Sequence, residues 1–294
     1  MLFFKYYLVG DIGGTHARVA VTSKLADVVS VEILETFASR EFPSLEEVLK
    51  AFIARHSDFD FNSLSGICIG VPGPVIDGRV QITNLPWDIS KESLENIIPG
   101  EIPVLLVNDI ALTVSYAAFS HNQSCYSLYR PSNFRKDAGN IVVISIGTGL
   151  GVGIAFYSPR YKSYTIIESE GGHASFAPNT TLDISILKHL EETFGRVSYE
   201  RVLSGSGLLS IYKFLAADGS VTLKSEKEVV NAAVSGSDGF AVSAAEIFCR
   251  IAMSYAGDLA LIVKGVGGIY FAGGMARRLE KFFKSSSDHH FYNK

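Results

Sequence analysis

The feature that most constrains the fold of this chain is a glycine turn between two short strands close to the N-terminus. The apolar run Tyr6–Gly10 predicts a strand, and residues 17–21 alternate enough to favour a second strand over a helix. The turn between them contains Gly13, Gly14 and Thr15. In Walker loops and dinucleotide-binding motifs the glycines instead precede a helix, which binds phosphate at its N-terminus. We therefore expect a β-hairpin here and neither of those helical motifs.

This hairpin turn is a candidate phosphate-binding site. Successive backbone N–H groups of a turn form a cradle for anions, and the hydroxyl of Thr15 adds a further donor. Asp11, at the end of the first strand, would then orient a magnesium-bound water. The alternative is a plain hairpin, because glycine adopts positive φ without steric cost. The stretch taken alone leaves both interpretations open.

Composition and charge exclude several classes of protein. The chain has 294 residues, of which 47% are hydrophobic and 19% are charged, enough for one large core or two ordinary ones. The net charge of −4 argues against a nucleic-acid partner, which requires a basic surface. Cys68, Cys125 and Cys249 are far apart and lack metal-binding spacing. We therefore expect free thiols in a reducing compartment and a cytoplasmic location.

Two apolar stretches raise the question of a membrane segment. The N-terminal stretch is short, is interrupted by Asp11, and lacks the basic region and cleavage site of a signal peptide. Residues 138–159 are uncharged and long enough to span a bilayer, but glycines divide them into two strands around a turn. We therefore expect no membrane association.

The opening pattern returns in the second half of the chain. Residues Ile141–Ile146 predict a strand, Gly147–Gly151 a glycine turn and Val152–Tyr157 another strand. We therefore predict two related α/β lobes, a small one over residues 1–110 and a large one over residues 111–294. Two such hairpins would bind the phosphates of one nucleotide from both sides.

Strands and helices are mixed along both lobes. Further strands are expected at residues 31–37, 66–71, 79–83, 103–109, 164–167 and 268–272. Helices are expected at residues 43–55, 90–98, 111–119, 182–194, 199–203, 208–217, 240–264 and 275–283. We expect the strand at 79–83 to pair beside the strand at 66–71, and Gly265 to cap the helix at 240–264.

Asn108 and Asp109 form the sharpest catalytic candidate. A buried strand beginning at Pro103 delivers them to its C-terminal end, the edge at which open α/β sheets bind ligands. Phosphoryl transfer to an alcohol needs a carboxylate near the attacking hydroxyl, and Asp109 would supply it. The alternative is that Asp109 caps the following helix, and the sequence alone does not decide between them.

Five further residues of the second lobe are candidates. Glu170 and His173 flank two glycines on a loop that would admit a polar ligand, although a hairpin loop with two solvated side chains is an equal alternative. Glu200 falls in the first turn of a short helix, where the helix dipole by itself favours an acid. Gly273 and Gly274 precede a helix and would let the backbone approach a ligand, but an ordinary strand-to-helix turn also explains them. No metal-binding motif accompanies these residues.

Taken in order, these motifs resemble those of the bacterial-type glucokinases, in the superfamily of sugar kinases, actin and chaperone ATPases. The resemblance runs from Tyr7 to about Phe283. The matching segments are Asp11–Thr15 with Arg18, Val107–Asp109, Ile146–Gly151, Glu170–His173 with Phe176–Pro178, Ser198–Gly205 and Gly267–Gly274. The resemblance implies an α/β, two-lobed ribonuclease H-like or actin-like ATPase fold, with the active-site cleft between the lobes.

The resemblance also implies ATP-dependent phosphorylation of glucose to glucose 6-phosphate. Asp109 would be the general base, and Mg²⁺ would contact Asp11 through water; no zinc is expected, because the cysteine-rich motif of repressor-type relatives is missing. The expected sugar-binding residues are Asn84, Asn108, Asp109, Glu170, His173 and Glu200. The expected nucleotide-binding residues are Asp11, Gly13, Gly14, Thr15, Gly147, Thr148, Gly149, Gly273 and Gly274. We expect a homodimer with glucose and ATP as its ligands.

Two departures from the family pattern keep other functions open. His16 stands where the family usually has Asn. Family members also continue with a further strand and a C-terminal helix, whereas this chain ends at Lys294. The alternatives are a catalytically weak sugar-binding or regulatory relative, and a kinase for another hexose.

Overall fold

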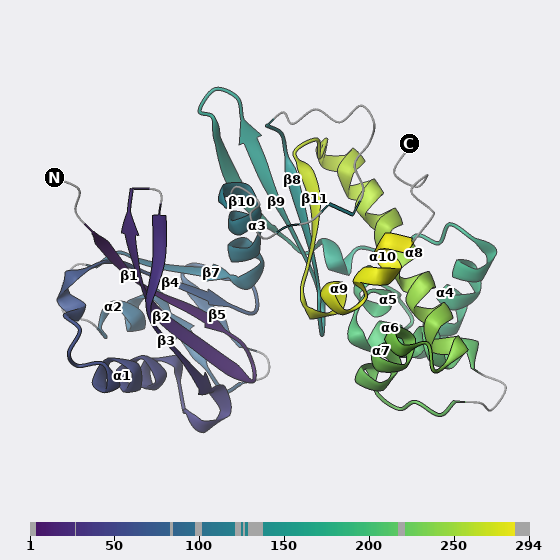
Figure 1. The fold of residues 1–294 in the computed structure, drawn as a ribbon, viewed down its shortest axis with the longest axis horizontal. Coiled ribbons are helices and arrows are strands. Elements are labelled where there is room, and N and C mark those ends of the chain that lie inside the picture. The colour runs from purple at the N-terminus through teal and green to yellow at the C-terminus, as the bar shows by residue number, and fades with distance from the viewer. Residues whose placement is uncertain are drawn as a thin grey trace. The chain divides into compact units, whose positions relative to one another are not determined.

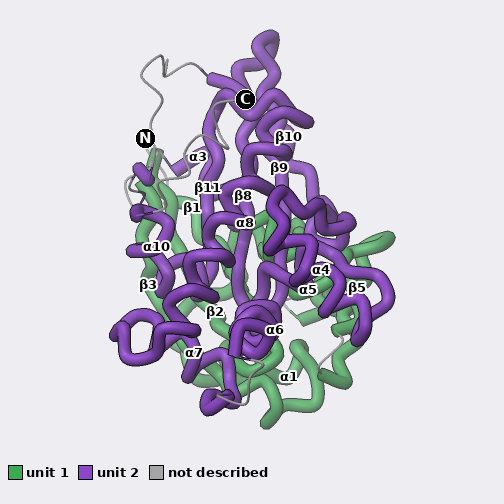
Figure 2. Tube along the Cα trace, turned by 90° about the vertical axis from the view of Figure 1, so that its right-hand side faces the viewer, with its two compact units in different colours: residues 1–112 green, residues 113–294 purple. Residues whose placement is uncertain are grey.

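Both glycine turns predicted from the sequence lie inside antiparallel hairpins in the structure, a computed structural model (Figure 1). The structure describes residues 4–26, 28–82, 85–97, 102–120, 125, 127–128, 138–216 and 221–285. Contacts between Cα atoms divide the chain into two units, Met1–Leu112 and Thr113–Lys294, which we call unit 1 and unit 2 (Figure 2).

Unit 1 is built on a five-stranded sheet with the order β3-β2-β1-β4-β7. The first three strands are antiparallel to one another, whereas β4 and β7 run parallel to β1. The strands are β1 Lys5–Ile12, β2 His16–Leu25, β3 Val28–Ala38, β4 Leu64–Val71 and β7 Val104–Asn108. Because β1, β4 and β7 are parallel, their carboxyl ends meet at one edge of the sheet.

Helices and a small second sheet complete unit 1. The helices are η1 Ser39–Glu41, α1 Leu45–Arg55, η2 Phe61–Ser63, α2 Lys91–Glu95 and α3 Asp109–Phe119, the last of which continues into unit 2. The two strands β5 (Arg79–Gln81) and β6 (Asp88–Ser90) pair with each other. The predicted pairing of residues 79–83 beside β4 is wrong, because β4 already has β1 on one side and β7 on the other.

The apolar stripe predicted for residues 43–55 is buried in the core of unit 1. Ser44 is the N-cap of α1, and its side chain accepts a hydrogen bond from the backbone N–H of Glu47. The buried residues of this helix are Leu45, Val48, Leu49 and Phe52. They pack in one cluster with the strands of the five-stranded sheet, so α1 and the sheet share a single core.

Unit 2 repeats the arrangement of the first four strands of unit 1. Its sheet has the order β10-β9-β8-β11, in which β8, β9 and β10 are antiparallel and β11 is parallel to β8. The strands are β8 Ile141–Ile146, β9 Leu150–Ser158, β10 Ser163–Ser169 and β11 Gly268–Ala272. This order corresponds to β3-β2-β1-β4, so the predicted internal repeat is confirmed.

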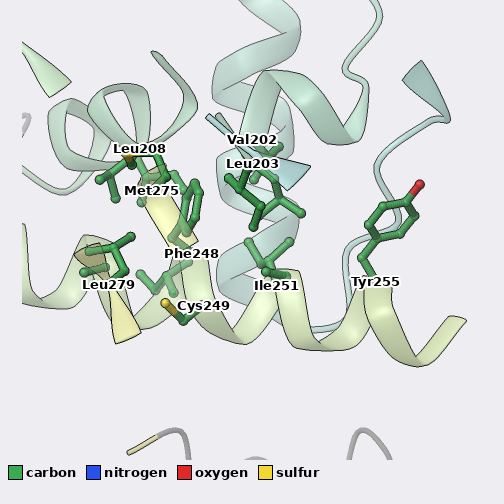
Figure 3. Packing of buried hydrophobic residues seen from close by; sticks show 14 of the residues in the cluster. Val202, Leu203, Leu208, Phe248, Cys249, Ile251, Tyr255, Met275 and Leu279 are labelled. Carbon is green, nitrogen blue, oxygen red and sulfur yellow. The ribbon is translucent and has the colours of Figure 1, made fainter. Parts of the chain in front are cut away.

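Unit 2 also contains helices, the longest of which is α8. They are η3 Gly171–His173, α4 Thr181–Phe194, α5 Tyr199–Val202, α6 Gly205–Leu215, α7 Glu226–Ser235, α8 Gly239–Val263, α9 Gly274–Arg278 and α10 Glu280–Ser285. Helix α8 contacts α6, α7 and α10. Figure 3 shows Phe248 and Cys249 of α8 among residues of neighbouring elements, including Leu208 and Met275. A helix contacted from several sides explains why residues 240–264 are rich in apolar residues, most of which are buried.

Three predicted details of unit 2 are corrected by the structure. Helix α7 was not predicted, although its N-terminus carries a capping box between Ser225 and Glu228. The helix expected at 275–283 is two short helices separated by Leu279. The C-cap of α8 is Lys264, with φ 52°, and Gly265 instead donates its N–H to the carbonyl of Ala260.

Two further sequence-based expectations, on membrane-spanning helices and on the state of the cysteines, can be compared with the described residues. Within them, no helix combines the length and the apolar character that crossing a membrane would require. Cys68, Cys125 and Cys249 are free thiols, as predicted.

Candidate active site

The carboxyl ends of three parallel strands place Asp11 and Asp109 at one edge of the unit 1 sheet. Asp11 is paired with Gly70 of β4, and Gly70 is paired with Val107 of β7. Neighbouring strands are about 4.8 Å apart, so the backbones of Asp11 and Val107 lie about 10 Å apart. Asp109 follows Val107 by two residues and is the exposed first residue of α3. The residues predicted for metal binding and for catalysis therefore share an edge of the sheet.

Asn108 connects the end of β7 to its surroundings. Its Nδ2 donates to the carbonyl of Gly73 at 2.7 Å, and its Oδ1 accepts the N–H of Ile110 at 2.8 Å. Asn108 is thus the N-cap of α3, the role that the sequence left open for Asp109. The capping interpretation of Asp109 is therefore wrong, since Asp109 is already inside the helix.

The first glycine turn is held in place by Ser39. The N–H of Gly13 donates to the carbonyl of His16 at 2.8 Å and closes the hairpin. Ser39 is fully buried; its Oγ donates to the carbonyl of Gly13 at 2.7 Å and its N–H to that of Thr15 at 3.0 Å. Gly13 does not have a positive φ, so conformational freedom is not the reason for glycine there. The turn residues Gly13 and Gly14 are partly buried and Thr15 is exposed.

Asp11 is suited to an indirect contact with magnesium. Its Oδ2 lies 2.8 Å from Nη1 of Arg18 in an ion pair whose side chains are 55% and 57% exposed. Carboxylate oxygens are ligands that Mg²⁺ prefers, and Mg²⁺ usually binds through one or two carboxylates, waters and substrate phosphates. Across the described ranges, no group of three or more His, Cys, Asp or Glu could hold a metal ion. The exposed carboxylate of Asp11 fits a metal that is held mainly by nucleotide phosphates and waters.

Three of the predicted sugar-binding residues come together in unit 2. Nε2 of His173 lies 3.6 Å from Oε2 of Glu170, and Nδ1 of His173 lies 3.8 Å from Oε1 of Glu200. Glu170 precedes η3, His173 ends it, and Glu200 lies in α5. The imidazole and both carboxylates are at least partly exposed, so polar groups of a ligand can reach them. Residues 171–173 form a 3₁₀ turn and not a hairpin loop, but the side chains of Glu170 and His173 are exposed to solvent, as that alternative expects.

The backbone of Leu150 connects this cluster to the second glycine turn. Oε2 of Glu200 accepts the N–H of Leu150 at 3.0 Å. A Cβ at Gly172 would lie 2.0 Å from the carbonyl oxygen of Leu150, and a Cβ at Gly149 would lie 2.8 Å from Oε2 of Glu200. The turn at Gly147–Gly149 and the carboxylate of Glu200 are therefore in direct contact. The sequence did not predict a role for Leu150, because Leu150 contacts Glu200 through its backbone N–H and not through its side chain.

Gly273 and Gly274, the two glycines between β11 and α9, have different surroundings. Gly273 has φ 89°, and a Cβ there would lie 2.3 Å from the carbonyl oxygen of Ile146 at the end of β8. Packing of the turn between β11 and α9 thus explains Gly273. By contrast, a Cβ at Gly147 or Gly274 would meet no atom within 4 Å, and Thr148 is exposed. These positions leave room for a ligand beside the backbone.

Two other features are not part of this arrangement. Asn84, a predicted sugar-binding residue, lies outside the described residues. A cavity of about 600 Å³ in unit 1 is lined by residues 53–54 and 57–62 and by Ile97. None of its lining residues is a candidate site residue.

Comparisons with known proteins identify the family. The sequence profile of the glucokinase family matches residues 8–294. A glucokinase from Nitrobacter hamburgensis is 34% identical over 284 residues, which cover 95% of this chain and 84% of the relative. The crystal structure of a glucokinase from an Antarctic psychrotroph has a TM-score of 0.79 at 30% identity, covering 99% of this chain and 90% of that one. A ROK family glucokinase from Streptomyces griseus, in complex with glucose and AMPPNP, has a TM-score of 0.63 at 21% identity, covering 98% and 90%.

The repeated strand order and these neighbours define a sugar kinase with the actin-like ATPase fold. More narrowly, the chain belongs to the glucokinase family. Its activity is the ATP-dependent phosphorylation of glucose. A catalytically weak relative and a kinase for another hexose are not favoured by these findings.

Proposed function

We propose that Asp109 is the general base of this enzyme. Its carboxylate takes the proton of the 6-hydroxyl of glucose while the hydroxyl oxygen attacks the γ-phosphorus of ATP, the bond to the β-phosphate oxygen breaks, and ADP leaves. The observation that carries this proposal is the position of Asp109, exposed at the carboxyl edge of the sheet that also bears Asp11. At the start of α3 it is the side chain of Asn108 that accepts the N–H of Ile110.

We propose that glucose is bound through its hydroxyl groups. Carboxylates accept hydrogen bonds from hydroxyls, and an imidazole donates through one nitrogen and accepts through the other when neutral. The proposed sugar-binding residues are Asn84, Asn108, Asp109, Glu170, His173 and Glu200. The observation that supports this set is the convergence of Glu170, His173 and Glu200 in unit 2. Since Leu150 occupies Oε2 of Glu200, the contact with sugar falls chiefly to Oε1.

We propose that the two hairpin turns bind the ATP phosphates through the hydroxyl of Thr15 and through backbone N–H groups other than those of Gly13 and Gly147, which close the turns by donating to the carbonyls of His16 and Gly149. The residues proposed to line the nucleotide site are Gly13, Gly14 and Thr15 in unit 1 and Gly147, Thr148 and Gly149 in unit 2, with Gly273 and Gly274 near the nucleoside. Asp11 would hold a magnesium-bound water, and the metal would neutralise phosphate charge. The open space beside Gly147 and Gly274 supports this assignment.

The substitution Asp109→Asn tests the assignment of the base. It keeps the shape of the side chain but removes the proton acceptor, so we expect kcat to fall by about 10² to 10⁴ while glucose still binds. An ADP-coupled assay measures turnover, and calorimetric titration measures glucose binding. Asp58→Asn makes the same change at an exposed residue of unit 1 outside the site and should leave both unchanged. Turnover of Asp109→Asn close to that of the wild type would overturn the assignment.

The oligomeric state and the cellular location of the protein are also proposals. We propose a homodimer, which sedimentation velocity of the full chain would test. We propose a cytoplasmic location, which the three free thiols support because cysteines of oxidising compartments are usually paired.

A further inference from the structure

Tyr255 of α8 is buried, and the proposed mechanism does not use its hydroxyl. The residue is 3% exposed, and its Oη donates to the carbonyl of Gly171 at 2.7 Å. Burial raises the pKa of Tyr255 well above its ordinary value, and the neighbouring Tyr199 raises it further. The hydroxyl therefore stays protonated and keeps donating at neutral pH. Through this bond Tyr255 holds the backbone of the residue that follows Glu170.

The ring of Tyr255 also reaches the segment that carries Glu200. It stacks on the ring of Tyr199 with centroids 3.8 Å apart and an angle of 23° between the planes. Tyr199 immediately precedes Glu200 in α5, and it is itself 5% exposed. On another side its ring meets Phe176 edge to face, with centroids 5.7 Å apart. The stack therefore limits where the start of α5, and with it Glu200, can lie.

Among the described residues, the backbone hydrogen bonds between the loop that carries Glu170 and His173 and the segment that carries Glu200 all lie on one side of η3. The N–H of Tyr199 donates to the carbonyl of Ala174 at 2.9 Å, and the N–H of Phe176 donates to that of Val197 at 3.0 Å. Both bonds lie C-terminal to His173. At the other end of η3, Gly171 is tied to Tyr255. Figure 3 shows Tyr255 at the end of the row of labelled α8 residues, with its ring projecting from the helix.

We propose that Tyr255 is a positioning residue for glucose binding: it fixes the loop of Glu170 and His173 and the helix of Glu200 in one arrangement. This inference rests on the proposed function, in which these three residues bind the sugar. The two contacts of Tyr255, one through its hydroxyl and one through its ring, act on the two segments separately. A loss of either contact would therefore misplace the sugar-binding groups without touching the phosphoryl-transfer step.

The substitution Tyr255→Phe removes the hydroxyl and keeps the stacked ring. The carbonyl of Gly171 retains the N–H of Ala174 as a partner, so the variant is expected to fold. We expect the KM for glucose to rise roughly three- to tenfold, the effect of one lost hydrogen bond, with kcat within about twofold and the KM for ATP unchanged. Tyr255→Leu removes the stack as well and should raise the KM for glucose further. The KM for glucose of Tyr255→Phe should therefore lie between those of the wild type and Tyr255→Leu.

A matched control is available in the same core. Tyr212 of α6 is fully buried, and its Oη lies 3.3 Å from Oγ1 of Thr222 and 3.4 Å from Oδ2 of Asp238. Tyr212→Phe makes the same chemical change away from the sugar-binding candidates. It should lower the melting temperature and leave the KM for glucose unchanged.

Glu200→Gln, measured in parallel, separates the failure of this inference from that of the proposed function. If Glu200→Gln raises the KM for glucose but Tyr255→Phe, like Tyr212→Phe, changes only the melting temperature, the role of Tyr255 is wrong. A fall in kcat at constant KM for Tyr255→Phe would also overturn it. If Glu200→Gln leaves the KM for glucose unchanged, the sugar-binding assignment itself fails. Calorimetric titration of each folded variant with glucose provides the same comparison at equilibrium.

Discussion

Asp183 shows how one buried charge joins the start of α4 to α8. It is 1% exposed, and both of its carboxylate oxygens bind the guanidinium of Arg250 in α8. The backbone N–H groups of Asn179 and Thr180 donate to its Oδ2, each at 3.1 Å. The carboxylate thereby ties the start of α4, and the loop before it, to α8.

We predict that Asp183→Asn lowers the free energy of unfolding by about 3 to 5 kcal/mol at neutral pH, because it leaves Arg250 with no counter-charge in a mostly buried site. The control is Glu47→Gln, which breaks the solvent-exposed ion pair with Lys50 and should therefore lower the free energy of unfolding far less than Asp183→Asn does. Urea unfolding followed by far-UV circular dichroism measures both. Equal losses in the two variants would contradict the prediction.

The same variant has a defined dependence on pH. Burial raises the pKa of Asp183, but the hydrogen bonds and charge of Arg250, together with the backbone N–H of Asn179, outweigh burial and hold the pKa below its ordinary value. Such a carboxyl stabilises the fold above its unfolded pKa of about 3.9, and this contribution is lost as pH falls through the folded pKa. The difference between wild type and Asp183→Asn should therefore be full above about pH 5 and shrink below about pH 4.

The sequence predicts the polar side chains of the candidate site that lie in recognisable motifs. It does not predict the residues that act through their backbone or through packing. Asp109 follows an apolar strand, where a carboxylate points to a ligand, and Glu170 and His173 flank two glycines that let a ligand approach the backbone. The choice between Asn108 and Asp109 as the cap of α3 could not be made locally, because both residue types cap helices well. Leu150 contributes a backbone N–H, and Tyr255 a contact across 84 residues of chain. In the sequence both look like ordinary core residues, and only packing reveals their role.

At the level of elements, the pattern of apolar residues along the chain predicted most strands and helices. Features that depend on packing between distant segments were not predicted. The strands at residues 141–146 and 268–272 and the long helix α8 were found to within one residue. The partner of β5 was not, because sheet order depends on which edges are already occupied. The break between α9 and α10 has no glycine or proline to indicate it. There Leu279 is fully buried, and its N–H bonds back to the carbonyls of Met275 and Arg277.

The turn between β11 and α9 gives a prediction at this scale. We predict that Gly273→Ala destabilises the protein by more than the roughly 1 to 3 kcal/mol that an unfavourable backbone conformation costs. The excess arises because its Cβ would also meet the carbonyl oxygen of Ile146 at 2.3 Å. Gly274→Ala should not destabilise the protein, since its Cβ meets nothing within 4 Å. It should instead raise the KM for ATP, because it fills the space proposed for the nucleotide.

Gly236, the C-cap of α7, provides the control for these variants. It has φ 74°, and a Cβ there would meet no atom within 4 Å, so Gly236→Ala incurs the backbone cost of roughly 1 to 2 kcal/mol and no clash. Thermal unfolding and the ATP dependence of the coupled assay compare the three variants. If Gly273→Ala cost no more than Gly236→Ala, the close contact with β8 would be disproved. If Gly274→Ala kept the wild-type KM for ATP, the nucleotide assignment at this turn would be wrong.

At the scale of the whole molecule, each unit has its own hydrophobic core. One cluster of buried residues runs from Leu8 to Leu106 and lies in unit 1, and the other runs from Val142 to Phe283 and lies in unit 2. The chain therefore contains the same sheet arrangement twice, each copy packed against its own helices. Chains with separate cores commonly depart from two-state unfolding.

The single tryptophan makes this separation measurable, because Trp87 is buried in the core of unit 1 while α4–α10 of unit 2 contribute most of the helical signal. We predict that tryptophan fluorescence and far-UV circular dichroism report different urea midpoints. Leu49→Ala, which opens a cavity in unit 1 at about 2 to 5 kcal/mol, should lower the fluorescence midpoint by about 1 M or more. Asp183→Asn should lower only the dichroism midpoint. Superimposable curves that both variants shift together would mean that the two cores unfold as one.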